Sequence, residues 1–153
     1  MSFRIPCHYD ASGGHHLLTQ IGVPGPFGGV TLYDGAVVDT GANVIDPTIT
    51  PAFLQRIPLS LAPRASIRIA GIGGTQYCDV YDLPCLTLGT PLAQVRVSSV
   101  SVVVGPLPGL LIALIGGDIL RRFKDIRVYY DPVDPWLHIV PPLTAGVVGT
   151  PWP

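Results

Sequence analysis

The chain has 153 residues and a formal net charge of -1 at pH 7, so it is long enough for one domain with a substantial core. It is too neutral to suggest nucleic acid or an anionic membrane surface as a partner. Charged residues make up 12% of the chain, about half the usual share of roughly 25%, and a domain this apolar is expected to cover part of its surface with another copy of itself.

Glycines and prolines, 18 and 17 in number, divide the chain into short runs rich in Val, Ile, Leu, Thr and Tyr. This pattern is typical of a single all-β domain, and we expect its core over residues 17–140 between strap-like or disordered ends. Strands are predicted over residues 16–23, 30–40, 43–46, 66–71, 75–88, 93–104, 110–116, 126–131 and 136–140. Within the second strand, Asp34-Gly35 is either a bulge or a tight turn.

Two segments are predicted to be helical. Residues 50–57 carry Thr50 as a potential N-cap before Pro51, and residues 117–123 carry Asp118 in the same role. Arg121 and Arg122 are expected to form a solvated end of the second helix, and the alternative is that one of them braces the loop that holds Asp39 through an ion pair.

Metal, secretion and membrane insertion are not expected. The three cysteines lack the spacing of a zinc knuckle, and the adjacent histidines His15 and His16 would point to opposite faces of a strand. The N-terminal "MSFRIPCHYDASGG" does not resemble a signal peptide, which favours a cytoplasmic location. Residues 97–117 are uncharged, but Pro106 and Pro108 interrupt them and their β-branched residues favour strands over a spanning helix.

Three motifs follow one another along the chain. In "AVVDTGANVI", residues 36–45, Asp39 is expected where a strand becomes a loop, as either a turn device or a reagent. In "IAGIGGTQY", residues 69–77, the glycines around Ile72 predict either a plain hairpin turn or the tip of a mobile flap. In "ALIGGDILRRF", residues 113–123, a strand ends in glycine before a short helix, which lets another backbone pass close by.

With these motifs in this order, the sequence resembles the retropepsin-like aspartic proteases, the single-domain family that includes the retroviral proteases. The resemblance runs from about Leu17 to Val140 and rests on "VVDTGAN", "AGIGG" and "LIGGDIL". It implies a closed barrel or sandwich with a flap hairpin and one short C-terminal helix, which functions as a symmetric homodimer without a cofactor.

The resemblance also assigns roles to the first motif. Asp39 is similar to the catalytic aspartate, and Thr40 to the residue whose hydroxyl locks the two active-site loops together across the dimer. Gly41 corresponds to the residue whose carbonyl meets the substrate backbone. Ala42 and Asn43 fall where the family lines its inner subsites and holds the peptide main chain.

The other two motifs supply the flap and the second loop. Gly71, Ile72 and Gly73 correspond to the substrate-binding tip of the flap, where the family's backbone amide at Ile72 reaches substrate through a water. Asp118 matches the acidic residue often found after the glycine of the last motif. The chain departs from the family in its proline- and glycine-rich ends, in Asn43 where many viral members carry aspartate, and in a longer segment between Asp39 and Ile72.

Aspartic protease chemistry needs two carboxylates, one to take a proton from water and one to donate a proton to the scissile carbonyl oxygen. The chain contains one Asp-Thr-Gly string, so a homodimer would supply the second Asp39 by symmetry. Two such carboxylates about 3 Å apart share a proton and titrate as a pair. The expected function is therefore an aspartic endopeptidase acting on peptide or protein, and the alternative is a catalytically silent dimerisation or peptide-binding module of the same fold.

Overall fold

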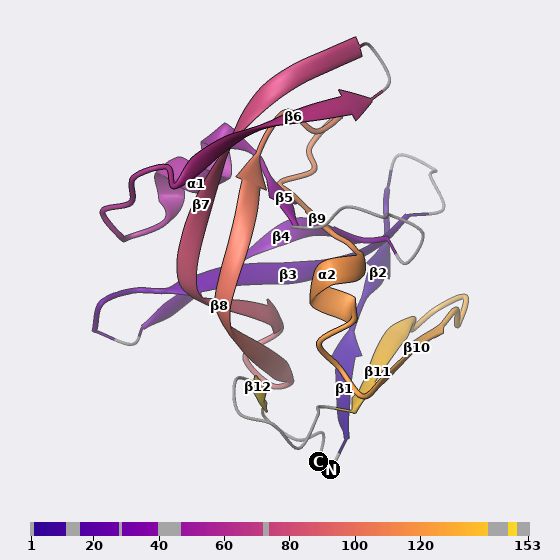
Figure 1. The fold of residues 1–153 in the computed structure, drawn as a ribbon. Coiled ribbons are helices and arrows are strands. Elements are labelled where there is room, and N and C mark those ends of the chain that lie inside the picture. The colour runs from indigo at the N-terminus through magenta and orange to yellow at the C-terminus, as the bar shows by residue number, and fades with distance from the viewer. Residues whose placement is uncertain are drawn as a thin grey trace.

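The computed structural model of the protein describes residues 2–11, 16–27, 29–39, 47–71, 74–140 and 147–149. Most of these residues lie in strands, and two short helices accompany them (Figure 1). In chain order the elements are β1 (Phe3–Pro6), β2 (His8–Tyr9), β3 (Leu17–Pro24), β4 (Val30–Val38), β5 (Thr48–Ile49), α1 (Pro51–Arg56), β6 (Ala65–Gly71), β7 (Gly74–Gly89), β8 (Gln94–Val104), β9 (Ala113–Ile115), α2 (Gly117–Leu120), β10 (Asp125–Tyr129), β11 (Trp136–Val140) and β12 (Val147–Gly149).

The main sheet closes into a barrel. Its strands follow the order β7, β8, β5, β9, β4 and β3, and β3 pairs again with β7 through Ile21 and Gly22. Strands β12, β6 and β2 extend the sheet from β8, β7 and β3. Two of the pairings, β4 with β9 and β5 with β8, are parallel. The prediction of an all-β closed barrel is confirmed.

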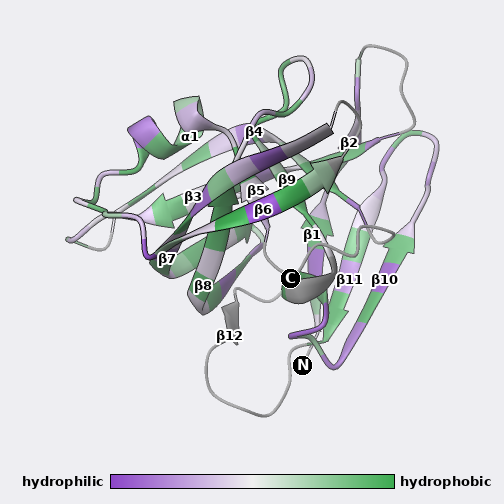
Figure 2. Ribbon diagram, turned by 45° about the horizontal axis from the view of Figure 1, so that its top comes forward, coloured by the Kyte–Doolittle hydropathy of each residue, from purple (hydrophilic) through white to green (hydrophobic). Residues whose placement is uncertain are grey.

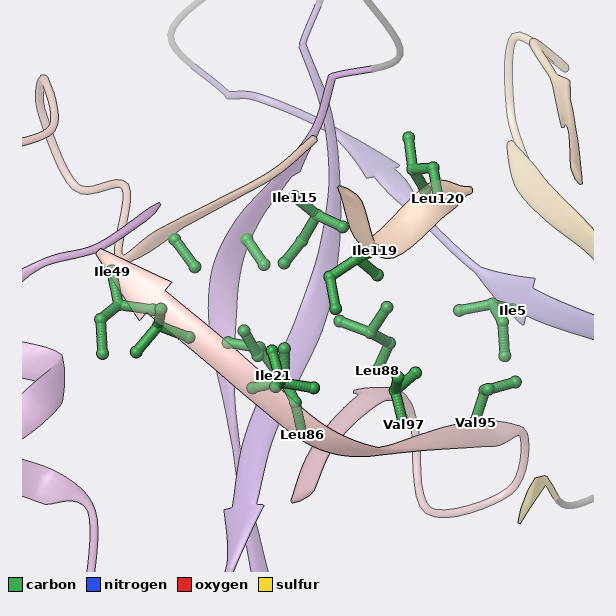
Figure 3. Packing of buried hydrophobic residues seen from close by; sticks show 14 of the residues in the cluster. Ile5, Ile21, Ile49, Leu86, Leu88, Val95, Val97, Ile115, Ile119 and Leu120 are labelled. Atoms are coloured by element: carbon green, nitrogen blue, oxygen red, sulfur yellow. The ribbon is translucent and has the colours of Figure 1, made fainter. Parts of the chain in front are cut away.

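Apolar side chains from nearly every strand fill the barrel and the space beside it. Ile21, Ile49, Leu86 and Ile115 are fully or almost fully removed from solvent, and Ile119 of α2 joins them (Figure 3). Burial on this scale supplies the main favourable term in folding. Outside the barrel, hydrophobic and hydrophilic residues alternate along β6 and β10, as expected of strands with one covered face (Figure 2).

Strands β1, β2 and β12, near the chain ends, were not predicted from the sequence patterns, whereas β10 and β11 were predicted. Strands β1, β11 and β10 form a separate antiparallel sheet in which Phe3 lies opposite Ile139 and Ile5 opposite Leu137. These four side chains are at most 2% exposed and belong to the same core as the barrel. The N-terminal segment is thus tied to the domain by its apolar residues.

Most predicted elements lie where the sequence indicates. Helix α1 begins after Thr50, whose hydroxyl accepts a hydrogen bond from Phe53 N at 3.2 Å, as the N-cap prediction requires. Residues 97–117 contain the end of β8 and the strand β9. Among the residues that the structure describes, no helix is long and apolar enough to cross a bilayer.

Two local predictions are resolved or corrected. Asp34-Gly35 is a bulge, because the register of β3 with β4 shifts by one residue there and leaves Gly35 unpaired at φ +114°. Helix α2 begins at Gly117, so Asp118 lies in its first turn and is not its N-cap. The helix also ends at Leu120, before the pair of arginines.

Arg122 braces a second irregularity, in the β7–β8 pair. The ladder skips Pro84, which has no amide hydrogen to donate, and Ser99, which adopts a φ of +54° that is rare outside glycine. The guanidinium of Arg122 donates to the carbonyl oxygens of Ser98 at 2.7 Å and Ser99 at 2.9 Å. Arg122 therefore connects the end of α2 to β8 and is not a solvated helix end.

Arg122→Met is expected to lower the free energy of unfolding by about 1 kcal/mol, because it removes both donors from these two carbonyls. The matched control is Arg127→Met, which removes one exposed ion pair to Asp125 and is expected to cost less than about 0.5 kcal/mol. Urea midpoints measured at equal m-value compare the two. Equal losses in both variants would contradict the bracing role.

Candidate active site

A buried parallel pair of strands leads to the candidate catalytic residue. Ala36, Val37 and Val38 of β4 lie beside Ala113, Leu114 and Ile115 of β9. Ala36, Ala113 and Ile115 have no exposed surface, and Val37 is 3% exposed. Small and branched apolar residues suit two strands packed this closely. The carboxyl ends of parallel strands meet at one edge of a sheet, so the ends of β4 and β9 lie side by side.

Asp39 is the first residue beyond β4. Its backbone N–H donates to the carbonyl oxygen of Ile115 at 3.0 Å, which continues the β4–β9 ladder by one step. Asp39 and Val38 are intermediate in burial, whereas Ala36 and Val37 before them are buried. A rigid apolar pair thus presents one carboxylate at the edge where both strands end.

Helix α2 follows β9 directly and packs on the core next to the end of that strand. The chain leaves Ile115, passes Gly116 and enters the helix, whose Leu120 N–H donates to Gly116 O at 3.2 Å. Ile119 is fully buried and Leu120 is 7% exposed, so both anchor the helix on the core. This packing fixes the position of the strand end to which Asp39 is bonded.

The second sequence motif forms an exposed antiparallel hairpin. Strands β6 and β7 pair from Ala65 with Val80 to Gly71 with Gly74, and the hairpin extends beyond the barrel (Figure 1). Tyr77 is 76% exposed. Gly74 has a φ of +112° and open space around the position that a Cβ would occupy. Few contacts with the core restrain this end of the hairpin.

The structure describes two of the eight predicted site residues, Asp39 at the barrel edge and the backbone of Gly71 at the hairpin end. The other six lie outside the described residues; they are Thr40, Gly41, Ala42, Asn43, Ile72 and Gly73. Their predicted roles therefore remain predictions.

A cavity of about 820 Å³, here called the His8–Asp34 pocket, was not indicated by the sequence. It is lined by His8, Tyr9, Asp10, Ala11, His16, Leu18, Asp34, Gly35, Pro108, Gly109, Leu110 and Leu111. His8 Nε2 lies 3.1 Å from Asp34 Oδ2. The one part of the sequence that hinted at an irregular feature here is Asp34-Gly35. Gly35 O accepts a hydrogen bond at 3.0 Å from the N–H of Ile112, the residue that follows the 108–111 loop, so the bulge holds this loop beside the pocket.

Other reactive groups among the described residues are less suited to hydrolysis. Burial raises the pKa of the Cys7 thiol to about 12 and also raises the pKa of Cys85, which disfavours a thiolate nucleophile at neutral pH. Within the described parts of the chain, no three His, Cys, Asp or Glu side chains gather as a metal site would require. Asp39 is the carboxylate that lies at the shared end of β4 and β9.

Comparison with known proteins supports the fold. The chain is similar to a solved structure described as the crystal structure of a retropepsin-like aspartic protease from Rickettsia conorii, with a TM-score of 0.58 and 18% sequence identity. The match covers 98% of this chain and 94% of that chain. No family model and no curated protein matches the sequence. At this identity the comparison establishes a retropepsin-like fold.

Proposed function

We propose that the protein is an aspartic endopeptidase whose active site forms between two identical chains. The observation that carries the proposal is the position of Asp39, directly beyond the buried β4 and hydrogen-bonded to the end of β9. The fold shared with a retropepsin-like aspartic protease supports the same assignment. Because the chain contains a single Asp-Thr-Gly string, the second carboxylate would come from the partner chain across a twofold axis.

The proposed reaction uses the two Asp39 carboxyl groups as one unit. The ionised group removes a proton from water, and the protonated group donates its proton to the oxygen of the scissile carbonyl. The resulting tetrahedral intermediate, a gem-diol, collapses when the C–N bond breaks: the protonated carboxyl passes its proton to the leaving amine, and the ionised carboxylate takes a hydroxyl proton from the gem-diol. The product carboxylic acid is released and the pair again holds one proton. Activity then requires one ionised and one protonated carboxyl and gives a bell-shaped pH profile on the acid side of neutrality.

The β6–β7 hairpin is proposed to act as the flap over this site. Its exposed strands and glycine-rich end are suited to a segment that opens for substrate and closes to exclude water. The backbone of Gly71, Ile72 and Gly73 would then contact the bound peptide. Thr40 and Gly41 would hold the two loops and the substrate backbone, and Ala42 and Asn43 would line the inner subsites.

Gly74→Val is expected to slow peptide turnover several-fold, since valine at a φ of +112° costs roughly 1–3 kcal/mol of backbone strain and would distort the hairpin end. No atom of the residues that the structure describes lies within 4 Å of the new Cβ, so backbone strain is the expected cause of the effect. Ser66→Val, in the exposed lower part of the same hairpin, is the control and is expected to change turnover less than about twofold. Equal kinetics in both variants would mean that the hairpin end is a static turn.

A mixed-peptide digest tests the proposed function directly. Purified protein is incubated with peptides rich in apolar pairs, and products are identified by mass spectrometry with and without a statine-type compound that mimics the tetrahedral intermediate. Cleavage that the compound suppresses supports an aspartic endopeptidase. Binding of the compound without any cleavage supports a silent peptide-binding module instead, and cleavage that the compound does not affect contradicts the assignment to Asp39.

A further inference from the structure

The His8–Asp34 pocket lies near Asp39, on the same face of the sheet. Leu18 lines the pocket and is paired directly with Val37, and antiparallel partners project to the same face. Val37 precedes Asp39 by two residues, about 7 Å along an extended chain, and residues two apart share a face. The hydrogen bond from Asp39 N–H to Ile115 O keeps the ladder regular through this step.

The walls of the pocket differ in polarity. Leu18, Leu110 and Leu111 supply an apolar wall, and Leu110 is 95% exposed. The same lining includes two acidic residues, Asp10 and Asp34. No lysine or arginine occurs among the described residues that line the pocket, whose lining includes His8 and His16 beside the two aspartates.

Asp34 retains capacity to bind a donor from a ligand. Its Oδ1 accepts a hydrogen bond from Gly35 N–H at 3.0 Å, and its Oδ2 lies 3.1 Å from His8 Nε2. An ionised carboxylate offers about four lone-pair positions, so these contacts occupy about half of them. The Asp34 side chain is 54% exposed, which leaves the remaining positions accessible from the pocket.

We propose that the His8–Asp34 pocket binds a basic side chain, arginine above all, of the peptide that Asp39 cleaves. The inference rests on the proposed function and adds a substrate preference to it. The methylene stem of arginine would pack on the leucine wall, while its planar guanidinium would donate to Asp34 and approach Asp10. The two carboxylates disfavour a glutamate side chain in the same pocket. A purely apolar substrate supplies no hydrogen-bond donor to them, so it gains less from the pocket than arginine does.

Paired peptides test this preference. Each pair has apolar residues on both sides of the scissile bond and carries arginine, or its neutral isostere citrulline, at one position, which is moved along the peptide from pair to pair. We expect kcat/KM to be about threefold to tenfold higher for arginine at the position that reaches the pocket, as suits a half-exposed charge pair. Asp34→Asn, which keeps the oxygen that accepts from Gly35 N–H, is expected to bring this ratio close to one.

Two further variants complete the design. Asp10→Asn removes the second carboxylate and is expected to lower the arginine-to-citrulline ratio. This variant replaces Asp34→Asn in the test if Asp34→Asn does not fold. Asp125→Asn removes a carboxylate on β10, outside the pocket lining, and is expected to keep the ratio. A ratio near one at every position of wild type, or a ratio that persists in both pocket variants, overturns the proposal.

Calorimetric binding of the same peptides separates failure of the pocket from failure of the enzyme. If no peptide is cleaved, the proposed function is wrong, and tighter binding of arginine than citrulline that Asp34→Asn removes would still support the pocket. Equal binding of both peptides, or no binding, overturns the pocket in that case. Cleavage without any preference for arginine overturns the pocket alone.

Discussion

Asp39→Asn is expected to reduce peptide cleavage by about 10³-fold or more while leaving the barrel folded. Asparagine keeps the shape of the side chain, and the backbone hydrogen bond from residue 39 to Ile115 O does not depend on the side chain. The amide can neither take a proton from water nor donate one as an acid, and a symmetric dimer of this variant loses both carboxyl groups at once. The measurement is kcat on one peptide, with thermal unfolding as the test of folding.

The control for this variant is Asp125→Asn, which alters an exposed carboxylate on β10 and is expected to retain wild-type turnover. A turn device at position 39 would behave differently, because asparagine is itself a good turn former and would leave activity nearly unchanged. Near-wild-type cleavage by purified Asp39→Asn protein, with contaminating proteases excluded by a specific inhibitor, would therefore refute the protease assignment.

Mixing chains tests whether the site is shared between subunits. When wild type is equilibrated with an about tenfold excess of Asp39→Asn chains, about a tenth of wild-type chains find a wild-type partner, and activity is expected to fall accordingly. Specific activity should also fall on dilution as dimers dissociate. An excess of an unrelated protein is the control for the mixing experiment.

A site complete within one chain would give the opposite result. Activity would then be unaffected by the inactive chain and would stay proportional to enzyme concentration at all dilutions. Sedimentation that shows a monomer at concentrations where peptide is cleaved would equally refute the shared site.

The barrel strands other than β5, together with α1, were predictable because their signals are local. Strand β5 was not predicted, and the strand predicted over residues 43–46 lies outside the described residues. Thr50 followed by Pro51 specifies a helix start from adjacent residues, and the run from Ala36 to Val38 specifies a strand that ends just before Asp39. The retropepsin-like barrel itself was predicted from the resemblance of three motifs. A local sequence pattern does not show which strand pairs with which. Nothing in the residues around Asp39 indicates that Ile115 O accepts the hydrogen bond from its N–H.

The remaining features depend on residues far apart in the chain. Strand β1 is stabilised by pairing with β11, which lies near the other end of the chain, and its short sequence carries little signal alone. The Asp34-Gly35 ambiguity was settled as a bulge by the register with β3, which no single strand encodes. The His8–Asp34 pocket needs β2, β4 and the 108–111 loop together, so only the assembled fold reveals it.

The parallel pairing of β4 with β9 has a consequence for biosynthesis. Strand β4 ends at Val38, yet the strand that completes its edge begins only at Ala113. During translation the segment that carries Asp39 leaves the ribosome long before β9, so β4 can pair with the earlier strand β3 but lacks its β9 neighbour while the hairpin β6–β7 and β8 are synthesised. A nascent or truncated chain that stops short of β9 therefore cannot present Asp39 in its final position, and assembly of the edge is delayed until most of the domain exists.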